Sequence, residues 1–286
     1  MNVWDEAVAS RGAEDIGSCI LEYCKEKAKS GVKSITAFSD ACGGQNHNYK
    51  LALMWMHRSQ VTNLEEINHI FMVSGHSYIP NDAHFGIIER AVYRSKELYV
   101  PEQFFNIIKQ CNKKQPFKVV EIEQDTFVSV KELERGCTIR KTSLDGHTVQ
   151  WRRIQWLQVR KSEPIKLYFK YIVLTDVPFS FVDFVKKGRK VPEVALKCRY
   201  SRHMRTLSLD KSADIRKLLK YIPPINHGFY SQRMENEHVL DVDDTHINTN
   251  MDSQEEKEKC PPDSANCSGT TRRTRRLRLD LKAKLS

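Results

Sequence analysis

The sequence lacks several patterns that would assign it to a familiar class of protein. It has no run of eighteen or more apolar residues, which a transmembrane helix needs, and its first residues lack the apolar stretch of a signal peptide. It also has no GxxxxGK[ST] or strand-linked GxGxxG motif for nucleotide phosphates, and no GxSxG motif of a serine hydrolase. We therefore expect an intracellular protein, nuclear or cytoplasmic, that makes no membrane contact and uses no small-molecule substrate.

The cysteines give no sign of a disulfide framework or of a zinc site. None of them forms a CxxC pair or shows the paired spacing of a zinc knuckle. Reduced thiols in an intracellular protein are the simplest interpretation. The eight cysteines are Cys19, Cys24, Cys42, Cys111, Cys137, Cys198, Cys260 and Cys267.

The composition is that of a globular protein with a basic balance. A chain of 286 residues can hold one large domain or two small ones, and 40% hydrophobic residues can build a core. Ten prolines and 29% charged residues indicate substantial exposed or irregular sequence. The net charge of +10 favours anionic partners such as nucleic acid, although a solvated basic surface has the same composition.

The first half of the chain alternates between helical and strand periodicity. Apolar residues recur at three-to-four spacing in the helical segments, and short apolar runs end in polar loops in the strand segments. This order predicts an α/β fold. The expected elements are a strand end at Met1–Trp4, helices at 13–29, 47–57, 83–98 and 101–111, and strands at Ile35–Phe38 and Ile67–Val73.

The most informative stretch is SITAFSDACGGQNHN, residues 34–48. An aspartate at the carboxyl end of a buried strand, as Asp40 is here, commonly faces a ligand in α/β folds. The same residue can simply cap the following turn, so both readings of Asp40 stay open. Gln45 and Asn46 could hold water or substrate or close the turn, and Cys42 is best read as a small buried residue.

A second carboxylate-bearing junction follows the next strand, in VSGHSYIPNDAHFGIIERA at residues 73–91. Asp82 is predicted at the N-cap of a helix, where free backbone N–H groups satisfy a carboxylate. Glu89 lies two turns further along the same helix, where a solvated face is the simpler interpretation. His76 and His84 flank the junction and could contact a phosphate or orient a carboxylate, or could serve the fold alone.

From about residue 117 the periodicity changes to alternation. Asp145-Gly146 is a hairpin signal, and residues 165–174 read as a long strand of basic and aromatic residues. A helix at 212–219 ends before Pro223-Pro224. The sequence then turns polar, first acidic and later rich in arginine, which predicts disorder. We therefore divide the chain into a core at 1–115, a β-rich subdomain with a closing helix at 116–232, and a disordered tail at 233–286.

Basic and aromatic residues are interleaved between residues 151 and 171 of this subdomain. Such a surface can contact phosphates through cations and stack bases on aromatic rings. Period-two alternation favours a plainer reading, in which the aromatic rings face the core and the cations face water. The candidate nucleic-acid contacts are Arg152, Arg153, Trp156, Arg160 and Lys161.

Taken together, the two motifs resemble a known family. SDACGGQNHN and VSGHSYIPNDAHFGIIERA, preceded by WDEAVASRGAEDIGSCI, are similar to a transposon-derived domain family of unknown function in which both stretches recur. The order of elements resembles the ribonuclease-H-like fold of DDE-type transposases and integrases. The resemblance covers roughly residues 1–230.

The resemblance implies metal-dependent cleavage and transfer of DNA strands as the ancestral activity. Two Mg²⁺ or Mn²⁺ ions held by carboxylates would stabilise the attacking and leaving oxygens. Asp40 matches the second acid of such a triad. Asp82 or Glu89 would be the third, with Asp82 favoured by the local motif and Glu89 by its position on the helix.

The sequence departs from the family pattern at its start. A ribonuclease-H-like sheet has a central first strand that supplies the first acid, whereas this sequence opens at what looks like the third strand. Asp5 is too far away in topology to replace the missing acid. We therefore expect an incomplete mixed sheet, DNA association at most, and impaired catalysis. The strand at 35–38 would also lack its central neighbour, leaving unpaired backbone groups unless another segment pairs with it.

Overall fold

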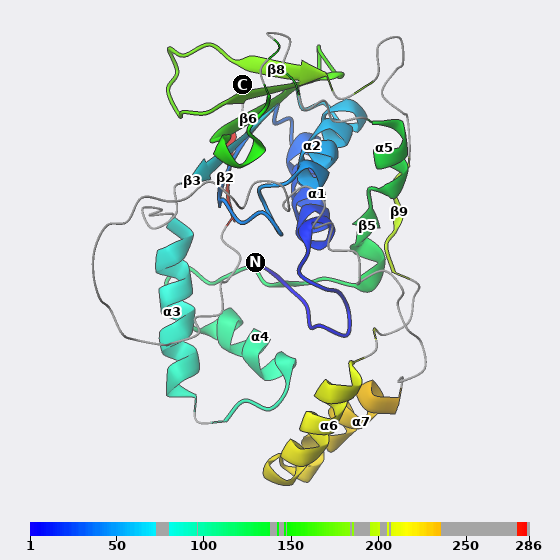
Figure 1. The fold of residues 1–286 in the computed structure, drawn as a ribbon. Coiled ribbons are helices and arrows are strands. Elements are labelled where there is room, and N and C mark those ends of the chain that lie inside the picture. The colour runs from blue at the N-terminus through cyan, green and yellow to red at the C-terminus, as the bar shows by residue number, and fades with distance from the viewer. Residues whose placement is uncertain are drawn as a thin grey trace, which may run out of the picture. The chain divides into compact units, whose positions relative to one another are not determined.

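The computed structural model describes residues 1–72, 80–95, 97–137, 142, 146, 148–183, 185, 195–200, 205, 207–235 and 279–284. The chain forms two compact units, Met1–Met204 with Arg278–Ser286, and Arg205–Leu277. The first unit is an α/β structure built on a mixed sheet (Figure 1). An α/β fold with flanking helices, as the sequence predicts, is therefore confirmed.

The main sheet has the strand order β10-β2-β3-β6-β7-β8. β2 and β3 are parallel, and every other neighbouring pair is antiparallel. Parallel neighbours need a crossover, which the helix α2 supplies. The strands are β2 (Ser34–Asp40), β3 (Glu66–Met72), β6 (Trp156–Arg160), β7 (Lys166–Lys170), β8 (Ser180–Asp183) and β10 (Leu279–Lys284).

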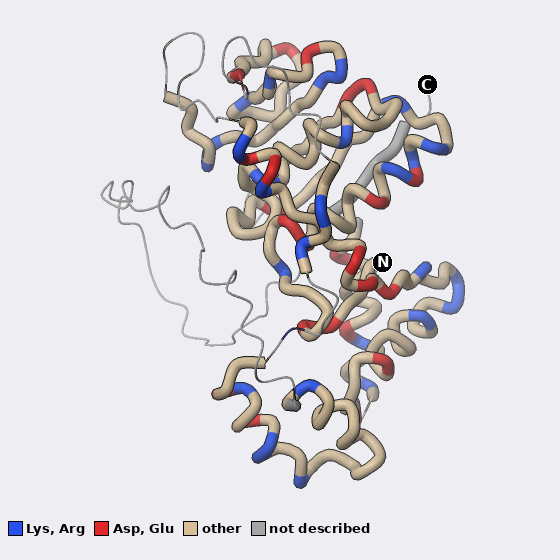
Figure 2. Tube along the Cα trace, turned by 90° about the vertical axis from the view of Figure 1, so that its right-hand side faces the viewer, with Lys and Arg blue, Asp and Glu red and all other residues tan. Residues whose placement is uncertain are grey.

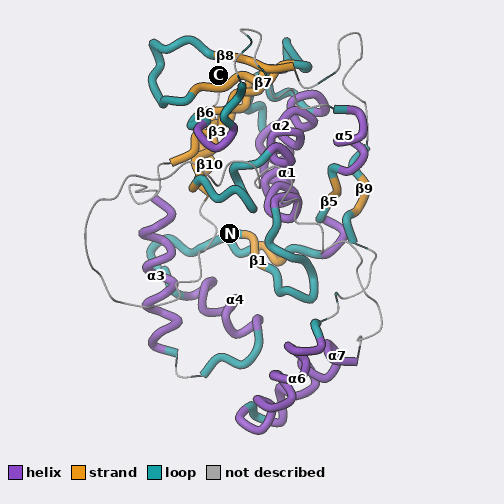
Figure 3. The backbone as a smooth tube through the Cα atoms, in the orientation of Figure 1, coloured by secondary structure: helices purple, strands orange, loops and turns teal. Residues whose placement is uncertain are grey.

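Helices cover one face of this sheet, as Figure 3 shows. The helix α1 (Ala13–Lys29) packs on α2 (Tyr49–Val61), and α2 packs on β3 and β6. The buried residues of β2 alternate, because Ile35, Ala37 and Ser39 face these helices. The apolar residues of α2 surround the whole helix, since it lies between α1 and the sheet, and residues 51–56 are all buried.

The α1–α2 contact depends on a missing side chain at Gly17. A Cβ atom added there would lie 2.3 Å from Sδ of Met54, which is itself fully buried. Glycine therefore lets the two helices approach closely in the centre of the core.

Smaller elements complete the first unit. β1 (Asn2–Val3) pairs in parallel with β4 (Val120–Glu121), and β5 (Val128–Ser129) pairs with β9 (Lys197–Cys198). Val3, Ile88 and Ile108 form a separate apolar cluster between β1 and two helices. The remaining helices of the unit are α3 (Pro80–Arg94), α4 (Pro101–Gln110), α5 (Lys131–Gly136), η1 (Gln124–Thr126) and η2 (Trp151–Arg153).

The second unit contains two short helices, α6 (Leu209–Leu218) and α7 (His227–Glu235), and the 3-10 turns η3 (Leu219–Tyr221) and η4 (Pro224–Asn226). Ser208 caps α6, where its hydroxyl accepts a hydrogen bond from the Lys211 N–H. The helix thus begins before the predicted 212–219 segment, and the predicted stop at Pro223-Pro224 is confirmed.

Three expectations about the fold are wrong. The strand at Met1–Trp4 joins β4 rather than the main sheet, because its Val3 packs in the cluster with Ile88 and Ile108. Residues 171–174 do not continue the strand predicted at 165–174, because β7 ends at Lys170. Residues 279–284 of the predicted disordered tail form β10, which pairs with backbone groups that the edge of β2 would otherwise leave open.

Other expectations fare better. The helix at 13–29 lies where the periodicity predicts it, and the helix predicted at 101–111 ends one residue earlier, at Gln110. Gly146 has a φ of +79° and Thr142 bridges Thr148, as a hairpin turn at Asp145-Gly146 requires, although Asp145 lies outside the described residues. By contrast, the boundary expected at residue 115 does not divide the main sheet, since β6, β7 and β8 extend the sheet of β2 and β3. Residues 236–278 also lie outside the described part of the chain.

The close approach of the helices at Gly17 gives a direct test of the core. We expect Gly17→Val to destabilise the protein by about 2 kcal/mol, because the added methyl groups overpack the contact with Met54. Gly86→Val on α3 is the matched control, since a Cβ there meets its first atom, on Arg90, at 3.6 Å. Urea unfolding of both variants measures the difference, and equal midpoints would contradict the packing.

Candidate functional site

The register of the main sheet aligns four residues in one row across it. Phe38 pairs with Ile70, Ile70 with Trp156, and Trp156 with Lys170. Beyond this row lie the last residues of β2, including Asp40, together with η2 and the turn after β7. Segments far apart in the sequence therefore meet at the edge formed by the carboxyl ends of β2, β3 and β7, which we call the carboxyl edge.

Asp40 is the last residue of β2 and is held by the turn that follows it. Its Oδ1 accepts a hydrogen bond from Asn46 Nδ2 at 2.7 Å and from the Cys42 N–H at 3.4 Å. The Cys42 carbonyl in turn accepts from the N–H groups of Gln45, Asn46 and His47 at 2.8–3.1 Å. Asn46 is fully buried, so the carboxylate has a fixed position although it is itself half-buried.

Two buried histidines lie beneath this turn. The ring of His47 stacks on Phe71 with centroids 4.0 Å apart, and His69 lies 4.2 Å from the same ring. Trp55 Nε1 donates to His69 Nδ1 at 3.2 Å, so the ring proton of His69 is on Nε2, which donates to Ser39 Oγ at 2.9 Å. The end of β2 is thus connected to the core of α2 by hydrogen bonds.

Both imidazoles are neutral at pH 7. Burial lowers the pKa of His47 to about 4, and a hydrogen bond to the Trp151 backbone opposes this only in part. Burial, and then the charge of His47, lower the pKa of His69 to about 3. A neutral His69 agrees with its hydrogen bonds, since the indole N–H of Trp55 needs an unprotonated acceptor.

η2 is fixed to the carboxyl edge by contacts with three neighbours. The Trp151 backbone forms a hydrogen bond with His47. Two residues after η2, Gln155 accepts a hydrogen bond from the Phe71 N–H at 2.8 Å through its carbonyl and donates its own N–H to the Lys170 carbonyl at 2.9 Å. Within η2, Arg152 and Arg153 are exposed. Two strand spacings, about 10 Å, separate Asp40 from the strand that follows η2.

The other three predicted nucleic-acid contacts take part in the sheet's own network. Trp156 Nε1 donates to Asn68 Oδ1 at 2.8 Å, and Lys161 Nζ donates to the Thr62 carbonyl at 2.5 Å. The guanidinium of Arg160 lies 4.0 Å from the centre of the Tyr168 ring. All three side chains are half-buried rather than open to a ligand.

The expectation that aromatic rings face the core and cations face water is therefore confirmed for the ring of Phe169 and wrong for the rings of Trp156 and Tyr168. Leu157, Val159, Leu167 and Phe169 fill the core face. Because side chains alternate along a strand, the rings of Trp156 and Tyr168 share the opposite face with Arg160 and Lys170. There the cations lie over the rings instead of extending into solvent.

The candidates on α3 have different environments. Asp82 is the third residue of α3, within its first turn, so the N-cap prediction is wrong by three residues because the helix already begins at Pro80. Glu89 is exposed, and the ring of His84 lies edge-on to Phe117 at 5.4 Å. His76 lies outside the described residues. Within the described part of the chain, no group of three or more His, Cys, Asp or Glu side chains could hold a metal ion.

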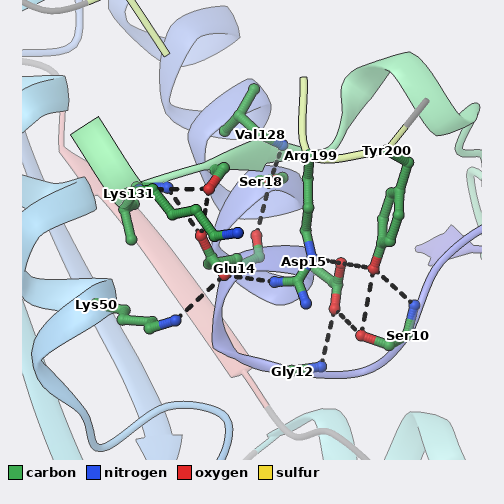
Figure 4. Close-up of polar contacts among 12 residues, drawn as sticks. Ser10, Gly12, Glu14, Asp15, Ser18, Lys50, Val128, Lys131, Arg199 and Tyr200 are labelled. Atoms are coloured by element: carbon green, nitrogen blue, oxygen red, sulfur yellow. Dashed lines mark hydrogen bonds and ion pairs between the residues drawn. The ribbon is translucent and has the colours of Figure 1, made fainter. Parts of the chain in front are cut away.

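Sequence reasoning missed a buried ionic cluster at the start of α1, drawn in Figure 4. Glu14 Oε1 accepts from the Val130 N–H at 2.8 Å, and its Oε2 accepts from Arg199 at 2.6 Å and Lys50 at 3.3 Å. Asp15, which is fully buried, accepts from the Tyr200 hydroxyl at 2.7 Å. The two adjacent acids in a first helical turn were the only sequence signal, since Arg199 is 185 residues away.

This cluster serves the fold rather than a reaction. Burial alone would raise the pKa of Glu14, but the Val130 hydrogen bond and the Arg199 and Lys50 charges bring it below its ordinary value. Both Glu14 oxygens have protein donors, so the carboxylate offers no open position to a ligand. Its effect is to fix residues 199–200 and the strand β5 to α1.

Comparisons with known proteins add no relationship, since no family model, curated protein or solved structure matches the chain. No described helix is long and apolar enough to span a membrane.

The two neutral histidines predict an acid-labile core. Their folded-state pKa values lie below the ordinary value of 6.5, so the unfolded chain binds protons first as the pH falls. Stability should therefore be complete above pH 6.5 and decrease toward pH 4, by up to about 1.4 kcal/mol per pH unit for each histidine.

Urea unfolding between pH 7 and pH 4 measures this slope. His47→Phe keeps a ring against Phe71 but removes one titrating group, and we expect a shallower pH dependence from it. The same slope in the variant and in the wild type would contradict the assignment of His47 as a buried neutral imidazole.

Proposed function

We propose that this chain is a transposase-derived domain that binds DNA through its carboxyl edge. The observation that carries the proposal is the meeting of Asp40, the ordered turn 41–48 and the exposed Arg152 and Arg153 at one end of the sheet. Guanidinium groups bind phosphate oxygens through paired N–H donors. A carboxylate and two phosphate-binding groups at the same end of one sheet could engage the same nucleic acid.

The distribution of charge along the described chain does not by itself define a DNA-binding face. Lys and Arg positions are interspersed with Asp and Glu positions along the described chain, as Figure 2 shows. Net charge therefore attracts nucleic acid without defining a face, and the specific contribution must come from particular residues. Arg152 and Arg153 are the two candidates that are exposed, whereas Arg160 and Lys161 are half-buried.

We also propose that the α/β fold of the first unit is an incomplete ribonuclease-H-like core. The parallel pair β2–β3 with the crossover helix α2, and an aspartate at the end of β2, support it. The neighbours on both sides, β10 and β6, are antiparallel and differ from the central first strand that the resemblance implies. We propose impaired catalysis because no group of three or more possible metal ligands is present among the described residues.

Asp40 and Asp82 are the proposed ligands for Mg²⁺ or Mn²⁺, with Glu89 as the alternative third acid. The described residues fit this role only in part, because Asp40 Oδ1 already accepts two hydrogen bonds and no cluster of three ligands is present among them. Weak binding by two carboxylates is the most that the proposal needs.

DNA binding is tested by fluorescence anisotropy over a range of salt concentrations. We expect salt-sensitive binding, and we expect Arg152→Gln with Arg153→Gln to reduce the slope of log K against log salt by about 2, because each phosphate contact contributes about 0.9. Lys25→Gln with Arg135→Gln removes the same charge from exposed sites on α1 and α5 and should leave the slope nearly unchanged. No binding at low salt would refute the proposal.

Metal binding is tested by thermal unfolding with and without millimolar Mn²⁺. A ligand that binds only the folded state raises stability by RT ln(1 + [L]/Kd), so an intact site gives an upward shift in Tm that Asp40→Asn abolishes. An unchanged Tm in the wild type would remove the metal from the proposal while leaving DNA binding intact.

A protein-binding module is the second candidate function. In the second unit, Leu209, Leu218, Tyr221 and Ile225 expose between 53% and 90% of their surface. Apolar residues that gather into one exposed patch are typical of protein interaction sites. Failure of DNA binding at low salt, with a cooperative unfolding transition, would favour this candidate.

A further inference from the structure

The turn after β7 exposes four consecutive large apolar residues. Tyr171, Ile172, Val173 and Leu174 expose 38%, 46%, 41% and 46% of their surface. Single exposed apolar residues are common, but a continuous run is unfavourable in water unless it has a function. The strand periodicity ends at Lys170, so these side chains are not the outward half of a strand.

The turn is held in place by a buried cation. Lys170 is only 4% exposed, and its Nζ donates to the carbonyls of Leu174 at 2.7 Å and Thr175 at 3.4 Å. At the start of the turn, the Tyr171 hydroxyl accepts a hydrogen bond from the Gln150 N–H at 3.0 Å. The apolar run is therefore fixed on the surface, so that binding a ligand would cost little further conformational entropy in this turn.

This turn borders the two exposed arginines of η2. The guanidinium of Arg153 lies 5.7 Å from the centre of the Tyr171 ring. Lys170 and Trp156 are register partners, so the end of β7 and the start of β6 lie side by side. The exposed apolar run thus begins beside Arg153, whose guanidinium group is suited to bind phosphate.

We propose that Ile172, Val173 and Leu174 form an apolar wedge that inserts between unstacked bases of DNA. This inference rests on the proposed function, because Arg152 and Arg153 would hold the phosphates next to the inserted step. Apolar side chains beside cations are used in this way to hold DNA in a kinked or unpaired state. The ligand class is therefore DNA with a weakened or unpaired step, rather than a uniform duplex.

The charge of the surroundings favours DNA over a protein partner. A protein partner would need acidic groups to match these cations, whereas DNA carries phosphate charges along its whole length. Here the exposed guanidinium of Arg153 lies beside the Tyr171 ring and donates to the Gln150 side-chain oxygen at 2.6 Å, and Arg152, its neighbour in the sequence, is also exposed. DNA can match both parts of this surface, because its phosphates can bind the arginines and its bases can contact the apolar side chains.

The test compares two labelled duplexes of the same length, one fully paired and one with two adjacent mismatches. We expect the full chain to bind the mismatched duplex at least about tenfold more tightly, because unstacking a paired step costs a few kcal/mol. Ile172→Ser with Val173→Ser should abolish this preference and leave the salt slope unchanged. Ile165→Ser with Val61→Ser, two exposed aliphatic residues outside the turn, is the matched control and should keep the preference.

The other outcomes would contradict the wedge, and one of them would also contradict DNA binding. Equal binding of both duplexes by the wild type, or a preference that survives Ile172→Ser with Val173→Ser, overturns the wedge but not DNA binding. Binding to neither duplex overturns the proposed function and the wedge together. Concentration-dependent self-association that the double variant removes, with DNA preference unchanged, overturns the wedge in favour of a protein interface.

Discussion

The parallel pairing of β2 with β3 is the constraint on which the rest of the first unit depends. Parallel strands cannot be joined by a tight turn, so the chain must cross over the sheet through α2. That helix is buried all round because α1 closes over it, and the contact is close only because Gly17 has no side chain. The pairing also brings the carboxyl ends of β2 and β3 to the same edge, where Asp40 lies opposite Met72.

Buried polar groups in this fold are stabilised in two different ways. Beneath the carboxyl edge, His47 and His69 are kept neutral by burial, and hydrogen bonds satisfy His69 on both nitrogens. At the start of α1, the carboxylates of Glu14 and Asp15 are matched by Arg199, Lys50 and backbone donors. An unmatched charge at either place would cost several kcal/mol, so both clusters restrict which residues can pack there.

The edges of the parallel pair are closed by antiparallel strands from later in the sequence. β10 pairs with β2, and β6 pairs with β3, which leaves neither edge of the pair open to uncontrolled association. The second of these pairings has a functional consequence. It brings η2 and the turn after β7 to the carboxyl edge, so that arginines, an apolar turn and Asp40 share one end of the sheet.

The sequence by itself determined the local elements, because periodicity and turn residues act over a few positions. The helices at 13–29 and 101–110, the strand that ends at Asp40 and the turn at Gly146 could all be predicted from such short-range signals. Only the tertiary structure decided the partners of each strand, the Glu14–Arg199 contact and the neighbours of Asp40. The Glu14–Arg199 contact and the β2–β10 pairing join residues more than a hundred positions apart, for which a single sequence holds no local signal.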